Sequence, residues 1–120
     1  MYKALYLSPM IPSYHIGETT NFFRDLFGFS IARSEKNYAI LFKDNLTIHI
    51  LQAGTDIGEM EFYLEVDGID SLWEVIAERA KNLAGIKVRA PFDREYGMRE
   101  FHIEVPHTRT LLFVGQGIKR

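Results

Sequence analysis

Leu46-Thr47-Ile48-His49-Ile50-Leu51-Gln52 is the stretch of this chain that most clearly indicates its fold. Hydrophobic residues alternate along it, so that Leu46, Ile48 and Ile50 fall on one face of an extended strand. That face belongs to a hydrophobic core. The other face carries His49 in mid-strand, and three roles are open for this histidine: metal ligand, contact to a small ligand, or hydrogen-bonded strand residue.

The composition is that of a globular chain with mixed surface charge. Hydrophobic residues make up 47% of the 120 residues, enough for the core of one domain. The 14 Lys and Arg against 16 Asp and Glu give a net charge of -2 without a basic run or an acidic tail, so we expect neither a nucleic-acid nor a membrane partner. Cysteine is absent, which excludes disulfides, thiolate catalysis and sulfur-ligated metals.

The N-terminal region has no secretion signal in its pattern. Residues 1–7 are followed by Ser8-Pro9 where a signal peptide would continue with a long apolar run and a small-residue cleavage site. No apolar stretch approaches the ~18 residues of a membrane span. We therefore expect a cytoplasmic location.

The first half of the chain predicts one strand, one helix and three further strands. The first strand covers about 3–12, although Pro9 and Pro12 indicate an edge position or an early end. Helical spacing of hydrophobic residues predicts a helix over 16–27 that ends at Gly28. The strands that follow are predicted at 29–35, 38–43 and 46–52.

The second half repeats this order after a linker rich in Gly and Asp at 53–58. Residues 60–66 alternate as a strand. Ser71 followed by Glu74 forms a capping box that predicts the start of a helix running to Gly85. The remaining strands are expected at 86–91, 98–105 and 110–116.

The repeated order predicts one α+β domain over residues 1–120, made of two modules at about 1–53 and 59–120. If each module forms a small sheet with its helix on one face, the opposite faces line a shared concavity. If Phe101 and Ile103 face the helices, Glu100, His102 and Glu104 project into it.

Two segments resemble the vicinal-oxygen-chelate superfamily, which contains glyoxalases, bleomycin-resistance proteins and extradiol dioxygenases. One is Met10-Ile11-Pro12-Ser13 with Ile16-x-Glu18-Thr19-x-x-Phe22-Phe23-x-Asp25-Leu26-Phe27-Gly28-Phe29; the other is Gly97-Met98-Arg99-Glu100-Phe101 running into Pro106 and Leu111-Leu112-Phe113. The likeness covers nearly the whole chain and is greatest to the bleomycin-resistance and glyoxalase-like members. It implies two βαβββ modules that form a cup-shaped mixed sheet with the helices on its convex face, a ligand on the concave side, and a homodimer.

The resemblance also implies the positions that hold a divalent metal in many members, which here are Ser8, His49, Glu61 and Leu112. His49 and Glu61 could ligate zinc, iron, manganese or nickel, whereas serine is a poor ligand and leucine has no donor atom. We therefore expect no metal cofactor. The alternative is a metal held by His49, Glu61 and His102, if their strands lie close enough.

The expected function is the binding or sequestration of a small molecule in the cup. The pocket residues expected for it are Ser8, His49, Glu61, Tyr63, His102 and Leu112. A metal-dependent lyase or dioxygenase is the alternative, with Glu100 as the candidate proton carrier. A third possibility is a regulatory or dimerisation module without a ligand of its own.

Other candidate residues have ordinary explanations. His15 and His107 are expected in exposed loops, and Tyr38, Tyr63 and Tyr96 are candidates for aromatic walls of a pocket. The sequence contains no nucleophile elbow, no glycine-rich phosphate loop and no HExxH motif. The mechanisms that depend on these motifs are therefore not expected.

Overall fold

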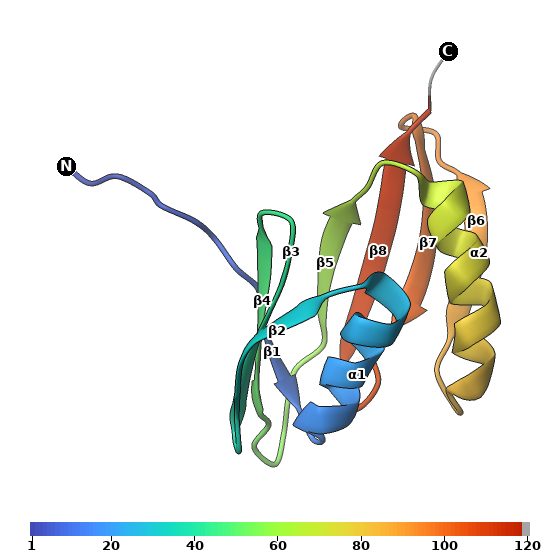
Figure 1. Ribbon diagram of the computed structural model, residues 1–120. Coiled ribbons are helices and arrows are strands. Elements are labelled where there is room, and N and C mark those ends of the chain that lie inside the picture. The colour runs from blue at the N-terminus through green and yellow to red at the C-terminus, as the bar shows by residue number, and fades with distance from the viewer. Residues whose placement is uncertain (119–120) are drawn as a thin grey trace.

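The computed structural model describes residues 1–118, and its strands form two four-stranded mixed sheets (Figure 1). The strand order is β1-β4-β3-β2 in the first sheet and β5-β8-β7-β6 in the second. In each sheet the first strand of the module runs parallel to the last, and the other neighbours are antiparallel. The α+β fold of two βαβββ modules is therefore confirmed.

The elements lie close to their predicted positions along the chain. The first module consists of β1 (Met10–Ser13), α1 (Ile16–Phe27), β2 (Ser30–Glu35), β3 (Tyr38–Lys43) and β4 (Leu46–Gln52). The second consists of β5 (Met60–Glu65), α2 (Ile69–Arg79), the short 3-10 helix η1 (Ala80–Asn82), β6 (Val88–Asp93), β7 (Met98–Glu104) and β8 (Thr110–Gly117). No helix within residues 1–118 is long and apolar enough to cross a membrane.

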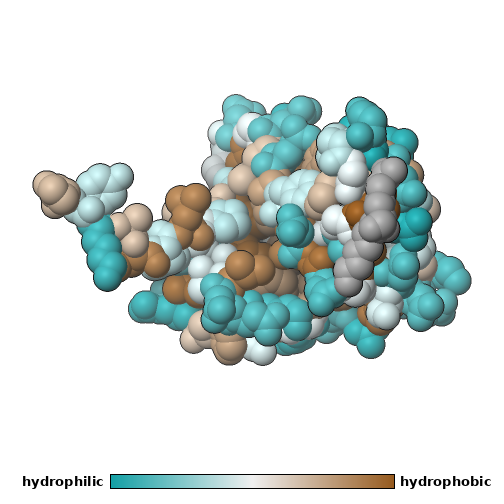
Figure 2. All heavy atoms as spheres, turned by 90° about the horizontal axis from the view of Figure 1, so that it is seen from above, coloured by the Kyte–Doolittle hydropathy of each residue, from teal (hydrophilic) through white to brown (hydrophobic). Residues whose placement is uncertain are grey.

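A single hydrophobic core joins the two modules. Helix α1 packs on β3 and β4, α2 packs on β7 and β8, and the two helices contact each other. Ile48 and Ile50 from β4 are buried in the same cluster as Phe101, Ile103 and the β8 residue Leu112. Seen from above, hydrophobic residues gather between the two halves of the molecule (Figure 2). The helix-facing sides of both sheets thus meet in this core, and their opposite faces point away from it.

Helix α1 begins and ends where the sequence predicts. The Nδ1 atom of His15 accepts a hydrogen bond from the backbone N–H of Glu18 at 3.1 Å, so His15 caps the helix N-terminus. Gly28 has the left-handed φ of 73° at the C-cap, a conformation that glycine adopts without steric cost. Local sequence therefore determines both ends of this helix.

Helix α2 begins earlier than predicted, and the prediction of a capping box at Ser71 is wrong. The helix starts at Ile69 after Gly68, whose φ is 88°. The side-chain oxygen of Gln116 accepts hydrogen bonds from the N–H groups of Gly68 and Ile69 at 2.9 and 2.8 Å. The cap therefore comes from the end of β8, far away in sequence. It accepts hydrogen bonds from N–H groups that a local capping side chain would otherwise satisfy.

The first strand is shorter than predicted, because pairing begins only at Met10. Residues 1–7 extend away from the body of the molecule as an arm (Figure 1). Leu5 and Leu7 of this arm are 83% and 98% exposed. Pro9 has no N–H group to donate to the ladder, which is consistent with the strand beginning after it.

Candidate binding site

Glu100 is the centre of a hydrogen-bonded cluster on the outer face of the second sheet, the face that points away from the helices. Its neighbours on β7, Phe101 and Ile103, are buried in the core, so Glu100 and His102 project from the opposite face as predicted. The Glu100 side chain is nevertheless 0% exposed. A buried carboxylate needs partners for its oxygen atoms, and the structure supplies four.

Four side chains contact the carboxylate of Glu100, and the two tyrosines and Arg94 among them donate to it. Tyr63 Oη donates to Oε2 at 3.0 Å, and Tyr96 Oη donates to the same oxygen. His102 Nε2 lies 3.1 Å and Arg94 Nη1 3.5 Å from Oε1. Because these groups come from β5, β7 and the loop between β6 and β7, Glu100 ties three segments of the second module together.

The donors also set the ionisation of the cluster. Burial alone would raise the pKa of Glu100, but hydrogen bonds from Tyr96, His102 and Tyr63, with the charge of Arg94, outweigh it and lower the pKa. Burial and the hydrogen bond to Glu100 raise the pKa of Tyr63. The hydrogen bond to Glu100 likewise raises the pKa of Tyr96. The lowered pKa favours the ionised form of Glu100, and the raised pKa values favour the protonated hydroxyls of Tyr63 and Tyr96.

Gly115 of β8 makes room for this arrangement. A Cβ atom at Gly115 would lie 2.7 Å from Cζ of Tyr63 and 3.2 Å from Cγ of Glu100. Ordinary van der Waals contacts between carbon atoms are 3.5–4.0 Å. A side chain at this position would therefore push Tyr63 away from the carboxylate.

Aromatic and cationic side chains surround the cluster. The His102 ring centroid lies 4.0 Å from that of Phe113 and 5.3 Å from that of Phe92. The Arg89 guanidinium lies 3.6 Å from the centroid of Phe92, and that of Arg94 lies 5.3 Å from it. The imidazole of His102 is therefore held between two rings and hydrogen-bonded at one nitrogen.

A hollow of about 790 Å³ adjoins the cluster, and we call it the β5–β8 hollow. Its lining contains acidic, basic and apolar residues of the second module only. They are Glu59, Met60, Glu61, Lys87, Val88, Arg89, His102, Glu104, Thr108, Arg109, Thr110 and Leu111. The structure therefore brings Glu61 and His102 to one concave surface, as the sequence predicted.

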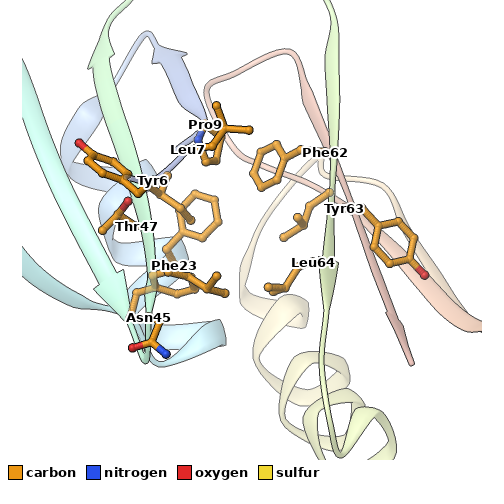
Figure 3. Close-up of a pocket in the computed structure, with 13 residues that line it drawn as sticks. Tyr6, Leu7, Pro9, Phe23, Asn45, Thr47, Phe62, Tyr63 and Leu64 are labelled. Atoms are coloured by element: carbon orange, nitrogen blue, oxygen red, sulfur yellow. The ribbon is translucent and has the colours of Figure 1, made fainter. Parts of the chain in front are cut away.

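A smaller pocket of about 220 Å³ has a different character (Figure 3). It lies between the modules, and apolar side chains such as Phe23, Phe62 and Leu64 point into it, while the Tyr63 hydroxyl points away on the other side of β5. Leu7 of the N-terminal arm borders it. This pocket continues the hydrophobic core and contains no charged side chain.

The structure separates the other predicted pocket residues. His49 lies on the first sheet, where its ring contacts the Tyr38 hydroxyl. Ser8 Oγ donates to the Thr47 carbonyl at 2.8 Å. Leu112 is 0% exposed in the core and faces away from the β5–β8 hollow. The shared concavity is therefore not formed within one chain, because the two polar faces lie on opposite sides of the common core.

The ligand set expected for a metal does not fit a divalent ion within this chain. Leu112 has no donor atom, and the Ser8 hydroxyl is engaged with the backbone. His49 belongs to one sheet, whereas Glu61 and His102 belong to the other. Over residues 1–118 no three His, Asp or Glu side chains gather in a metal-ligating arrangement.

His15 and His107 are exposed, as predicted, but both have structural partners. The Nε2 atom of His107 contacts the carboxylate of Glu18, and the His107 ring centroid lies 5.4 Å from that of His15. The His107 carbonyl accepts a hydrogen bond from the N–H of Tyr14 at 2.8 Å. These contacts join the start of α1 to the turn before β8.

Sequence reasoning missed several residues of the site. Arg89, Phe92, Arg94 and Phe113 were not identified, although the first three share one short segment with Tyr96. Alternating Arg and aromatic residues at 89–96 were a signal that could have pointed to this segment. The strand predicted at 86–91 also ended too early, because β6 continues through Phe92 to Asp93.

The fold is similar to those of solved bleomycin-resistance, antibiotic-binding and glyoxalase structures. A bleomycin resistance determinant encoded on the transposon Tn5 aligns with a TM-score of 0.77 and 21% identity, over 95% of this chain and 98% of that one. The antibiotic-binding protein TnmS3 from Streptomyces sp. CB03234 aligns with 0.78 and 13%, over 98% of both chains. Lactoylglutathione lyase from Agrobacterium tumefaciens aligns with 0.77 and 14%, over 96% and 95%.

At the level of sequence, no family model and no curated protein matches this chain. The structural likeness nevertheless confirms that the chain has the fold of the vicinal-oxygen-chelate superfamily.

Proposed function

We propose that this chain, which has the vicinal-oxygen-chelate fold, binds a small organic molecule in the β5–β8 hollow without a metal ion of its own. The observation that carries the proposal is the buried Glu100 carboxylate with its four partners. An ionised group at 0% exposure is costly to bury, and such networks are concentrated at functional sites. Here the network orders the residues next to a hollow.

The size and lining of the hollow support a ligand of moderate size and mixed polarity. Its volume of about 790 Å³ falls in the range of about 300–1,000 Å³ typical of small-molecule sites. Lys87, Arg89 and Glu61 supply charges of both signs, and Val88 and Leu111 supply apolar surface. Bleomycin and related antibiotics are the first ligands to test, because proteins of this fold include a bleomycin resistance determinant and an antibiotic-binding protein.

A second copy of the chain is part of the proposal. The arm exposes Leu5 and Leu7, and the outer face of the first sheet exposes Met10 and Phe42. Large exposed apolar patches mark interaction sites. A homodimer in which the outer face of one first sheet covers the hollow of the partner would create the shared concavity between chains and would bring His49 to it.

Binding is favoured over the alternative of a metal-dependent lyase or dioxygenase. Leu112 lies in the core and Ser8 is engaged by the backbone, so two of the four positions that the resemblance assigns to a metal offer no ligand here. Sequestration of a small molecule requires only the β5–β8 hollow and the polar side chains that line it. No contact among residues 1–118 specifically favours the lyase or the dioxygenase.

The test is calorimetric titration of protein purified without chelators and analysed for bound metal. We expect metal-free bleomycin, or another antibiotic of a panel, to bind with about one site per chain. Glu100→Gln should weaken that binding, whereas Glu78→Gln should leave it unchanged, because among residues 1–118 Glu78 of α2 pairs only with the exposed Lys81 of η1. One tightly held divalent ion per purified chain would contradict the proposal.

A further inference from the structure

We infer that His102 is the residue that hydrogen-bonds the ligand, through Nδ1, and that Glu100 is a positioning residue that holds the His102 proton on Nε2. The ligand would then carry an N–H or O–H donor. This inference rests on the proposed function. It assigns different roles to Glu100 and His102, which are neighbours on one face of β7.

The first step concerns the nitrogen that faces Glu100. An ionised carboxylate is only an acceptor of hydrogen bonds, and the other three partners of Glu100 are all donors. The lowered pKa of Glu100 supports the ionised form. His102 Nε2, 3.1 Å from Oε1, must therefore donate. In neutral His102 the proton consequently lies on Nε2 and the Nδ1 lone pair is free.

The second step concerns access to Nδ1. This atom makes no hydrogen bond with residues 1–118. Over the same residues, no buried side-chain nitrogen or oxygen lacks a hydrogen-bond partner. Nδ1 is therefore accessible to solvent, and His102 lines the β5–β8 hollow. A ligand in the hollow can reach an acceptor that the protein itself leaves unused.

The third step concerns rigidity. The His102 side chain is only 12% exposed and is packed between the rings of Phe113 and Phe92. Together with the bond to Glu100, these contacts leave the imidazole little freedom to rotate. A fixed acceptor avoids the entropy cost of ordering a side chain when the ligand binds.

The surroundings define the class of ligand. Lys87 and Glu61 border the same hollow and form no ion pair with the described residues. The hollow therefore offers the Nδ1 acceptor of His102 together with side chains of opposite charge. A polar molecule with amide, amine or hydroxyl groups fits this lining better than a hydrocarbon does.

Two substitutions separate the roles of the two nitrogens. In His102→Gln the longer amide can still donate to Glu100, but nothing replaces Nδ1. In His102→Asn the shorter amide can place its oxygen near the position of Nδ1, but it does not reach Glu100. With metal-free bleomycin as the probe, we expect His102→Gln to keep the unfolding midpoint and to weaken binding at least tenfold. We expect His102→Asn to lose stability and to retain more binding than His102→Gln.

Binding by His102→Gln as tight as wild type would overturn the inference, because a purely structural His102 is well replaced by Gln. Side-chain ¹⁵N NMR of the free protein gives a test that needs no ligand. We expect neutral His102 to be protonated at Nε2, and Glu100→Gln to introduce the other form, because an amide can donate as well as accept. A proton on Nδ1 in the wild type would equally overturn the inference. If wild type does not bind the probe but the NMR result holds, the positioning role of Glu100 is supported and the proposed function fails for that ligand.

Discussion

Gly115→Ala tests whether the Tyr63–Glu100 contact organises the site. The added Cβ would lie 2.7 Å from Cζ of Tyr63 and 3.2 Å from Cγ of Glu100. Tyr63 can avoid this overlap only by turning away, which breaks its hydrogen bond to the carboxylate.

The expected magnitude follows from two opposing effects. A hydrogen bond to a charged group contributes about 1.5–3 kcal/mol. Replacing glycine by alanine within a strand raises the free energy of unfolding by about 0.5–1 kcal/mol, because glycine loses more backbone entropy on folding. We therefore expect Gly115→Ala to lower the free energy of unfolding by about 1–2 kcal/mol.

Urea denaturation of a double-mutant cycle provides the assay. In a Tyr63→Ala background the overlap with the ring is gone, so Gly115→Ala should be neutral or stabilising by up to about 1 kcal/mol. Gly117→Ala is the matched control, because a Cβ at Gly117 meets nothing within 4 Å. Equal losses from Gly115→Ala in both backgrounds would refute the reasoning.

Three further predictions concern other parts of the molecule. Gln116→Ala removes the cap of α2 and should cost about 1 kcal/mol and speed amide exchange at the start of that helix, whereas Ser71→Ala should have little effect. The lowered pKa of Glu100 stabilises the folded state, fully so at a pH above about 4.3, the pKa of Glu in the unfolded chain. This stabilisation is lost as the pH falls through the lower pKa of Glu100 in the folded state. Glu100→Gln should therefore flatten this part of the pH dependence in acid unfolding curves. Leu5→Glu with Leu7→Glu should reduce the molar mass measured by light scattering from a dimer to a monomer, and an unchanged mass would contradict the proposed role of the arm.

The sequence predicted the elements well, because their signals are local. Alternation located β4 and β5, and helical spacing with Gly28 located α1. The start of α2 was wrong because Gln116, which caps it, lies 47 residues from Ile69. A local capping box cannot compete with a cap that forms only when β8 packs beside the helix.

The site was predicted in part for a related reason. Strand alternation correctly placed Glu100 and His102 on the face opposite the core. Alternation does not determine how two modules pack, so His49 was expected beside them and lies instead on the other sheet. Leu112 was assigned to the pocket by resemblance; it lies in the core and borders the apolar pocket between the modules, and it does not line the β5–β8 hollow.

We expect a small molecule to bind in the β5–β8 hollow beside His102 and not in the apolar pocket between the modules. The most direct measurement is a map of amide NMR shifts during titration with the antibiotic that binds most tightly. We expect the largest changes at the strand segments that line the β5–β8 hollow, around Glu61, Arg89 and His102. Changes confined to the lining of the apolar pocket, around Phe23 and Leu64, would contradict this expectation.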